Sequence, residues 1–140
     1  MFSVDLGDVI LDLRSRNQPV PRPIRLPKES EVREFEDHLG LQFHPDYRRY
    51  LLEASDVVFG TLEPVTITRP ESHTHLPLVV SDARAMGVPD DLLPICEDNG
   101  DYFCVDVVGT VRYWSHNGAT DESWPTVAQW IHDVWIGENT

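Results

Sequence analysis

Basic side chains are scarce in this sequence. Its 140 residues include eleven Lys and Arg against twenty-four Asp and Glu, for a formal net charge of −13. Binding to nucleic-acid phosphates or to anionic lipid depends on clustered Lys and Arg, so this balance argues against both. An excess of negative charge keeps a protein soluble and favours a partner with a basic surface. We therefore expect another protein as the partner, with no role for nucleic acid or a membrane.

Long apolar runs and cysteines are also few. No stretch approaches the roughly twenty apolar residues of a membrane-spanning helix, and the N-terminus lacks the basic and apolar regions of a signal peptide. The two cysteines, Cys96 and Cys104, flank a predicted two-residue turn at Asn99-Gly100. Paired positions across that turn would sum to 199, whereas 96 and 104 sum to 200, so the two side chains should point to opposite faces. We expect two buried free thiols and a reducing, cytoplasmic location.

The chain is long enough for one domain with one hydrophobic core, and 41% of its residues are hydrophobic. Four prolines between residues 18 and 27 exclude a helix there and predict an extended strap. We assign residues 1–28, a short helix and this strap, to the same domain as residues 29–140. The helix is predicted by apolar residues at helical spacing, namely Phe2, Leu6, Val9, Ile10 and Leu13.

The remaining pattern predicts an α+β fold. Phe35 and Tyr50, from two successive predicted helices, are expected to share one core. The C-terminal half is predicted to form a three-stranded antiparallel meander, followed by a last helix that begins near Pro125. The sheet would therefore pack with N-terminal and C-terminal helices, and the four tryptophans would be core or half-core residues. Predicted helices lie at 29–39, 45–54 and 79–86, and predicted short strands at 57–59 and 65–68.

The negative charge is concentrated in the second half of the chain. Residues 1–70 carry nine bases and twelve acids, net −3, whereas residues 71–140 carry two bases and twelve acids, net −10. No base occurs between Arg84 and Arg112. The candidate partner-binding residues are the acids of this stretch, Asp90, Asp91, Glu97, Asp98 and Asp101.

The order of the predicted elements resembles that of the SUKH superfamily, which includes the yeast cell-wall-assembly regulator and bacterial immunity proteins. Residues 30–52 are similar to the family's "helix, Gly, Leu-Pro-x-x-Tyr, helix" signature, although His44 stands where the family usually has Leu. Residues 93–116 and the closing Trp-rich helix are similar to its central hairpin and last helix. The resemblance implies a SUKH-like single domain that binds proteins. It also implies an immunity role, because bacterial members often neutralise a cognate toxin, commonly a nuclease.

Metal-binding interpretations find little support. His73 and His75 lie on one side of an extended segment, but no third ligand stands at a familiar spacing, so exposed loop histidines are expected. Asp98–Asp101 superficially suggests a calcium loop, but Gly109 stands where its last glutamate belongs. A tight Asn-Gly turn explains the segment better. No metal and no cofactor are predicted.

Catalytic interpretations are equally weak, and no enzyme is predicted. Cys96 or Cys104 could pair with His116 as nucleophile and base, but neighbouring carboxylates would raise a thiol pKa. The acids between 97 and 106 could include an acid–base pair, and a solvated acidic face explains them equally well. The predicted function is a protein-binding domain of the immunity type, one half of a toxin-antitoxin-like pair. The alternative is an intracellular regulatory or scaffold module without a toxin partner.

Overall fold

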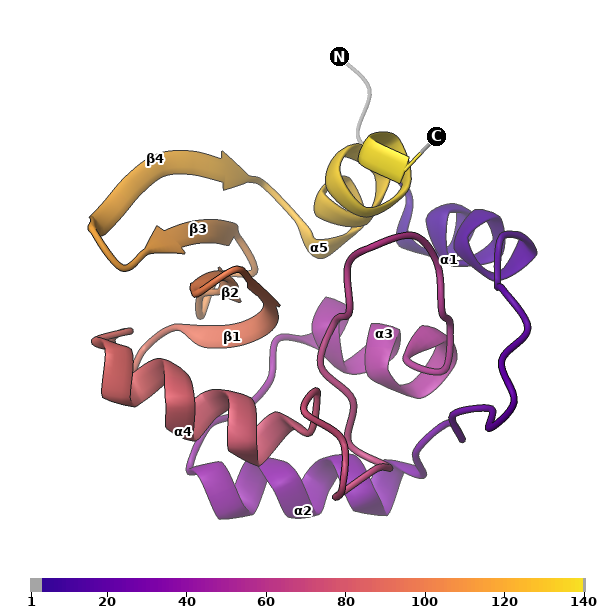
Figure 1. Cartoon of the computed structure of the whole chain (residues 1–140), viewed down its shortest axis with the longest axis horizontal. Coiled ribbons are helices and arrows are strands. Elements are labelled where there is room, and N and C mark those ends of the chain that lie inside the picture. The colour runs from indigo at the N-terminus through magenta and orange to yellow at the C-terminus, as the bar shows by residue number, and fades with distance from the viewer. Residues whose placement is uncertain (1–3, 140) are drawn as a thin grey trace.

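A computed structural model describes residues 4–139 of the chain. Figure 1 shows a sheet on one side of the molecule, with helices beside it and below it. The α+β class is therefore confirmed. The helices are α1 (Leu6–Ser15), α2 (Glu29–Leu39), α3 (Pro45–Ala54), α4 (Leu76–Met86) and α5 (Val127–Trp130), which continues as a π-helical segment (Ile131–Ile136) and a 3-10 turn (Gly137–Asn139). The strands are β1 (Leu93–Asp98), β2 (Asp101–Val105), β3 (Val111–Ser115) and β4 (Gly118–Trp124).

The strands form an antiparallel meander in the order β1-β2-β3-β4. The predicted turn between β1 and β2 is present, and its two residues, Asn99 and Gly100, have φ values of 53° and 91°. Positive φ at both central residues is what a tight hairpin turn of this kind requires. Asp98 is paired with Asp101 next to the turn. The register shifts between Pro94 and Cys96, so β1 carries an irregularity of the β-bulge type.

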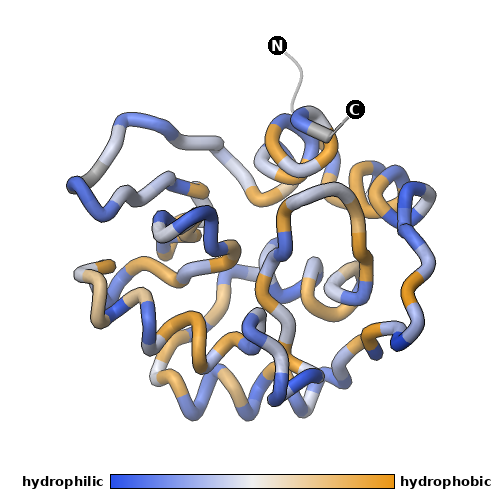
Figure 2. The backbone as a smooth tube through the Cα atoms, in the orientation of Figure 1, coloured by the Kyte–Doolittle hydropathy of each residue, from blue (hydrophilic) through white to orange (hydrophobic). Residues whose placement is uncertain are grey.

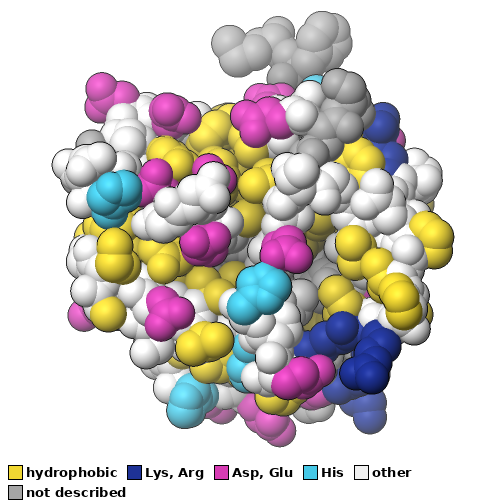
Figure 3. All heavy atoms as spheres, in the orientation of Figure 1, with side chains coloured by type: hydrophobic (Ala, Val, Ile, Leu, Met, Phe, Trp, Pro, Cys, Tyr) yellow, Lys and Arg dark blue, Asp and Glu magenta, His cyan; other side chains and the backbone are white. Residues whose placement is uncertain are grey.

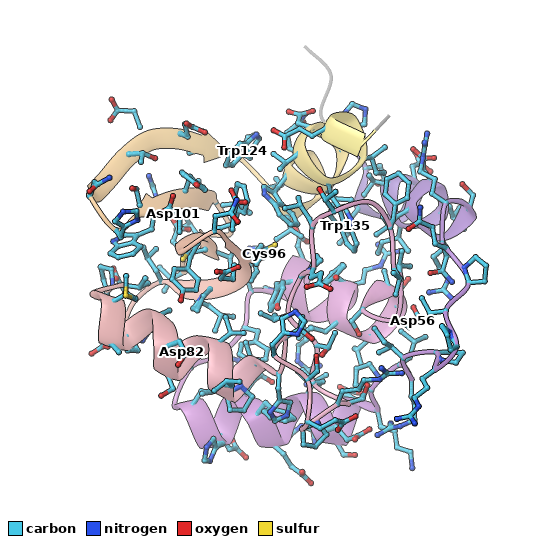
Figure 4. All side chains as sticks on the ribbon, in the orientation of Figure 1. Asp56, Asp82, Cys96, Asp101, Trp124 and Trp135 are labelled. Atoms are coloured by element: carbon cyan, nitrogen blue, oxygen red, sulfur yellow. The ribbon has the colours of Figure 1, made fainter. Side chains whose placement is uncertain are left out.

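Both cysteines are buried free thiols, as predicted. Cys96 pairs with Phe103, and Cys104 is the next residue along β2, so the two side chains point to opposite faces of the sheet. Figure 4 shows Cys96 between the sheet and the helices. Burial raises the pKa of the Cys104 thiol to about 12 and also raises the pKa of Cys96.

We expect both thiols to resist alkylation in the folded protein, because the reactive thiolate is suppressed and the sulfur atoms are covered. Treatment with iodoacetamide at about pH 8, followed by mass spectrometry, should give no label without denaturant and two labels in urea. Rapid native labelling of either thiol would contradict this burial. A Cys96–Cys104 disulfide in protein purified with a thiol-blocking reagent would contradict the register.

Three element predictions need correction. Residues 57–59 and 65–68 are loops rather than strands, and they carry only an isolated bridge between Thr66 and His75. The loops place three β-branched side chains in the core, namely those of Val57, Val65 and Ile67. Their burial therefore comes from core packing and not from pairing in a sheet. Strand β4 was not predicted, because its sequence GATDESW lacks the apolar alternation of a half-buried strand.

One hydrophobic core joins the sheet to the helices. Figure 2 shows hydrophobic segments in both the sheet and the helices. Helix α1 contributes four residues to this core, while the predicted Phe2 lies outside the described residues. Tyr50 is buried as expected, but Phe35 only packs half-buried against the edge. Val32 is the buried residue of α2. Among residues 4–139, no helix is both long and apolar enough to cross a bilayer.

The strap, residues 17–27, runs alongside the loop of residues 57–69. Near its start, the Val58 amide donates to Asn17 Oδ1 at 2.8 Å and the Gln18 amide donates to the Val58 carbonyl at 2.8 Å. Near its end, Thr68 Oγ1 donates to the Arg25 carbonyl at 2.7 Å. The strap is therefore fastened to the loop near both of its ends, and side chains between them line a cleft.

Candidate functional site: an acidic surface and two clefts

The five acids predicted to bind a partner fall into two groups. Asp90 and Asp91 precede β1, whereas Glu97 and Asp98 end it and Asp101 begins β2. Strand β1 separates the groups by about 16 Å, at roughly 3.3 Å per residue. The five residues are therefore neighbours in sequence without forming one cluster in space.

At the hairpin end, two carboxylates share one tyrosine. The Tyr113 hydroxyl lies 2.9 Å from Asp101 Oδ2 and 3.2 Å from Asp98 Oδ2. The His116 amide donates to Asp101 Oδ1 at 3.0 Å, and His116 Nδ1 lies 2.7 Å from the same oxygen. These hydrogen bonds, led by the amide, lower the pKa of Asp101. His116 is thus placed against a carboxylate at the hairpin end, where Figure 4 labels Asp101.

The other acids are more open to solvent. Glu97 is exposed and accepts a hydrogen bond from the Gly100 amide at 3.0 Å. Asp90 is fully exposed and lies 3.5 Å from Arg84 Nε. Asp91 is exposed as well. Solvent screens an exposed ion pair of this kind, so its interaction energy is small. Arg84 therefore offsets the negative charge of Asp90 and Asp91 only weakly.

Few bases balance the acidic half of the protein. Arg84 and Arg112 are its only two, and Arg112 Nε lies 2.9 Å from Asp106 Oδ2. Further acids of this half are exposed, namely Asp82 on α4 and Asp121 and Glu122 on β4. On the face shown in Figure 3, the largest group of Lys and Arg lies at the lower right, over the strap, away from the sheet. The sheet side is therefore electronegative.

The two loop histidines have different surroundings. His73 is exposed as expected, and its Nε2 lies 2.5 Å from Glu63 Oε2. His75 is half-buried instead, with its ring 5.6 Å from the Phe35 ring, and burial lowers its pKa. The expectation of two exposed histidines is therefore wrong for His75. Within residues 4–139, no group of three or more side chains could hold a metal ion.

Sequence reasoning missed two clefts, because their walls come from segments far apart in the chain. The strap cleft, of about 480 Å³, lies between the strap and residues 57–74. The hairpin cleft, of about 310 Å³, lies between residues 61–63 and the end of β1, where Glu97 and Asp98 line it. The two clefts share four lining residues, Leu62, Glu63, His73 and Thr74.

Comparison with known proteins identifies the family. The family described as "SMI1-KNR4 cell-wall" (SUKH_5) matches residues 6–136. A crystal structure of a protein from Pseudomonas syringae pv. tomato matches with a TM-score of 0.91 and 47% identity, covering 94% of this chain and 98% of that one. No curated protein matches the chain. The match over residues 6–136 takes in both segments on which the resemblance rested, and the chain belongs to the SMI1-KNR4 family of the SUKH superfamily.

Proposed function

We propose that this chain is a cytoplasmic, non-catalytic immunity protein that binds and neutralises a cognate toxin of the nuclease type. The observation that carries the proposal is the electronegative sheet side, where both Arg84 and Arg112 are already paired with aspartates. Membership of the SUKH superfamily supports it, because this family includes immunity proteins and regulators that act by binding other proteins.

An acidic surface of this kind suits a toxin that acts on nucleic acid. Such a toxin needs a basic cleft for phosphates, and an acidic protein can occupy or cover that cleft. Repulsion among the carboxylates raises the free energy of the unbound protein, and a cationic surface relieves it on binding. Asp98 and Asp101 are held in place by Tyr113, so the hairpin end presents preformed negative charge.

The first test identifies the partner and its effect. Tagged protein purified from its host would yield the partner, whose domain would then be expressed alone in a bacterial host. Growth arrest that is relieved by co-expression of this chain would support the immunity role. A bound partner that is harmless on expression would instead favour the alternative, an intracellular regulatory or scaffold module.

The second test compares two variants that remove equal charge from the two acidic groups. Glu97→Gln with Asp98→Asn changes the hairpin end, and both side chains keep an oxygen that can accept their hydrogen bonds. Asp90→Asn with Asp91→Asn changes the loop end. We expect the hairpin variant to bind the partner about tenfold more slowly at low salt and with a weaker salt dependence, and the loop variant to bind less than threefold more slowly.

Dissociation rates should change less than association rates, because long-range steering acts on encounter. Asp101 stays unchanged in both variants, because it anchors the hairpin through His116. A larger effect of the loop variant would show that the partner binds near Asp90 and Asp91, at the start of β1, instead of at the hairpin end. Wild-type association rates and salt dependence in both variants would show that the acidic surface is not the binding surface.

A further inference from the structure

The strap cleft has the size and lining of a small-molecule site. Its volume of about 480 Å³ lies within the usual range for such sites, roughly 300–1,000 Å³. Apolar side chains make up much of its wall, among them Val20, Ile24, Val57 and Leu62. A few polar groups within an apolar wall are the usual means of orienting a ligand.

Two arginines of this cleft are unusual for lacking a carboxylate partner. Eight of the eleven Lys and Arg form ion pairs with Asp or Glu. Within residues 4–139, only Arg22, Lys28 and Arg69 form none. Arg22 and Arg69 both line the strap cleft. In a chain with twenty-four acids, two guanidinium groups that line one cleft and lack a carboxylate partner favour an anion there.

The two arginines are neighbours, although 47 residues separate them in the sequence. Arg69 Nη2 donates to the backbone carbonyl of Arg22, so loop and strap hold each other at this point. The one carboxylate that lines the cleft, on Glu63, is paired with His73 instead. Figure 3 shows Lys and Arg side chains gathered over this part of the strap.

A third polar group lies in the same cleft. Tyr50 is only 4% exposed and lines the cleft. The Tyr50 hydroxyl can donate a hydrogen bond to a carboxylate oxygen of a ligand in the cleft. Burial raises the pKa of Tyr50, so the hydroxyl stays a neutral donor.

We infer that the strap cleft binds a small apolar carboxylic acid, whose carboxylate lies between Arg22 and Arg69 and whose apolar group packs on the cleft wall. Guanidinium groups bind carboxylates with paired, planar hydrogen bonds. The net negative charge of the chain disfavours anion binding on most of its surface. Binding of a carboxylate therefore depends on the local positive charge of Arg22 and Arg69. The strap cleft adjoins the hairpin cleft, but Arg22 and Arg69 line only the strap cleft. The inference does not depend on the toxin proposal.

The groove along α2 and α3 offers no such site, although its volume of about 730 Å³ is larger. Its two arginines are engaged, since Arg33 pairs with Glu29 and Arg48 pairs with Glu29 and Glu36. A ligand carboxylate there would have to displace existing ion pairs. Cleft volume alone therefore does not identify the ligand site.

Calorimetric titration of the full chain with 3-phenylpropanoate tests the inference without any knowledge of the partner. We expect saturable binding with a Kd of about 1 mM or below, as is usual for a ligand of this size. The neutral 3-phenylpropanamide should bind at least about tenfold more weakly, because it lacks the charge that the arginines recognise. Acetate, which lacks the apolar group, should show no saturation.

Three variants locate the site. Arg22→Gln and Arg69→Gln should each weaken binding of 3-phenylpropanoate by about tenfold or more, and Tyr50→Phe by severalfold. Lys28→Gln is the matched control, because Lys28 also lacks an ion pair but does not line the cleft. Unchanged thermal unfolding of the variants would show that they remain folded.

Several results would overturn the inference. Equal binding of the acid and the amide would exclude recognition by charge, and wild-type binding by Arg69→Gln would place the ligand elsewhere. Absence of saturation by 3-phenylpropanoate would reject the site. If a peptide bearing the same side chain bound while the free acid did not, the cleft would be a protein-docking site and the assignment would be wrong.

Discussion

Replacement of Trp135 by alanine should lower the free energy of unfolding by about 3–5 kcal/mol, the usual cost of removing a large aromatic side chain from a core. Trp135 is 0% exposed, and its indole N–H donates to the Phe59 carbonyl at 2.9 Å. Its ring centre lies 6.1 Å from that of Tyr50. Figure 4 shows Trp135 between the C-terminal helix and the 57–69 loop. The substitution therefore leaves a cavity and also removes the donor to a loop carbonyl.

Urea unfolding followed by circular dichroism measures this loss. Trp124→Ala is the control, because Trp124 is only half-buried against the core and should cost about 1–2 kcal/mol. Trp135→Phe separates the two causes, since it keeps an aromatic ring and removes the N–H donor. Equal losses for Trp135→Ala and Trp124→Ala would contradict the central position of Trp135.

Gly109→Ala should destabilise the protein by about 2–4 kcal/mol, through positive φ and steric contact together. Gly109 has a φ of 94°, which costs a residue with a side chain about 1–2 kcal/mol. An added Cβ would also lie 2.7 Å from His44 Nε2. The His44 ring has little freedom to move, because its Nδ1 accepts the Asp46 amide at the start of α3.

Gly100→Ala provides a matched comparison for Gly109→Ala. Gly100 has a similar φ of 91°, but an added Cβ would meet no atom within 4 Å. The Gly100→Ala substitution should therefore lower the free energy of unfolding only by the cost of the positive φ, about 1–2 kcal/mol. Thermal and urea unfolding of both variants would isolate the contact with His44. Equal destabilisation would show that the β2–β3 turn is not packed on α3, and recovery in a His44→Ala, Gly109→Ala double variant would confirm the contact.

The helix ends and the hairpin turn were predicted correctly where a proline, a glycine or an Asn-Gly pair marks them in the sequence. Pro45 marks the first turn of α3, Gly40 ends α2 with a φ of 66°, and Asn99-Gly100 forms the hairpin turn. Strand β4 carries no such signal, because its pairing with β3 places it at the sheet edge, where polar side chains are tolerated. The β-branched loop residues were misassigned because burial, rather than strand pairing, selects them.

The candidate sites show the limit of sequence reasoning more sharply. The acids from Asp90 to Asp101 were treated as one group, although a strand runs between its two ends. Charge counts identified the acidic half but could not show that Tyr113 holds Asp98 and Asp101 together. The strap cleft joins residues 20–24 to residues 57–74, and no local pattern reports such a contact.

Strand β4 also has a consequence for how the protein behaves at high concentration. As the last strand of the sheet, it leaves a row of backbone N–H and C=O groups without strand partners, which another molecule's edge could extend. In a pairing that brought the middle of β4 against the middle of β4 on a second copy, its exposed Asp121 and Glu122 would face the same two carboxylates. Like charges directly opposite each other destabilise strand pairing. The polar sequence that concealed this strand from prediction thus disfavours pairing of the β4 edge with the β4 edge of a second copy.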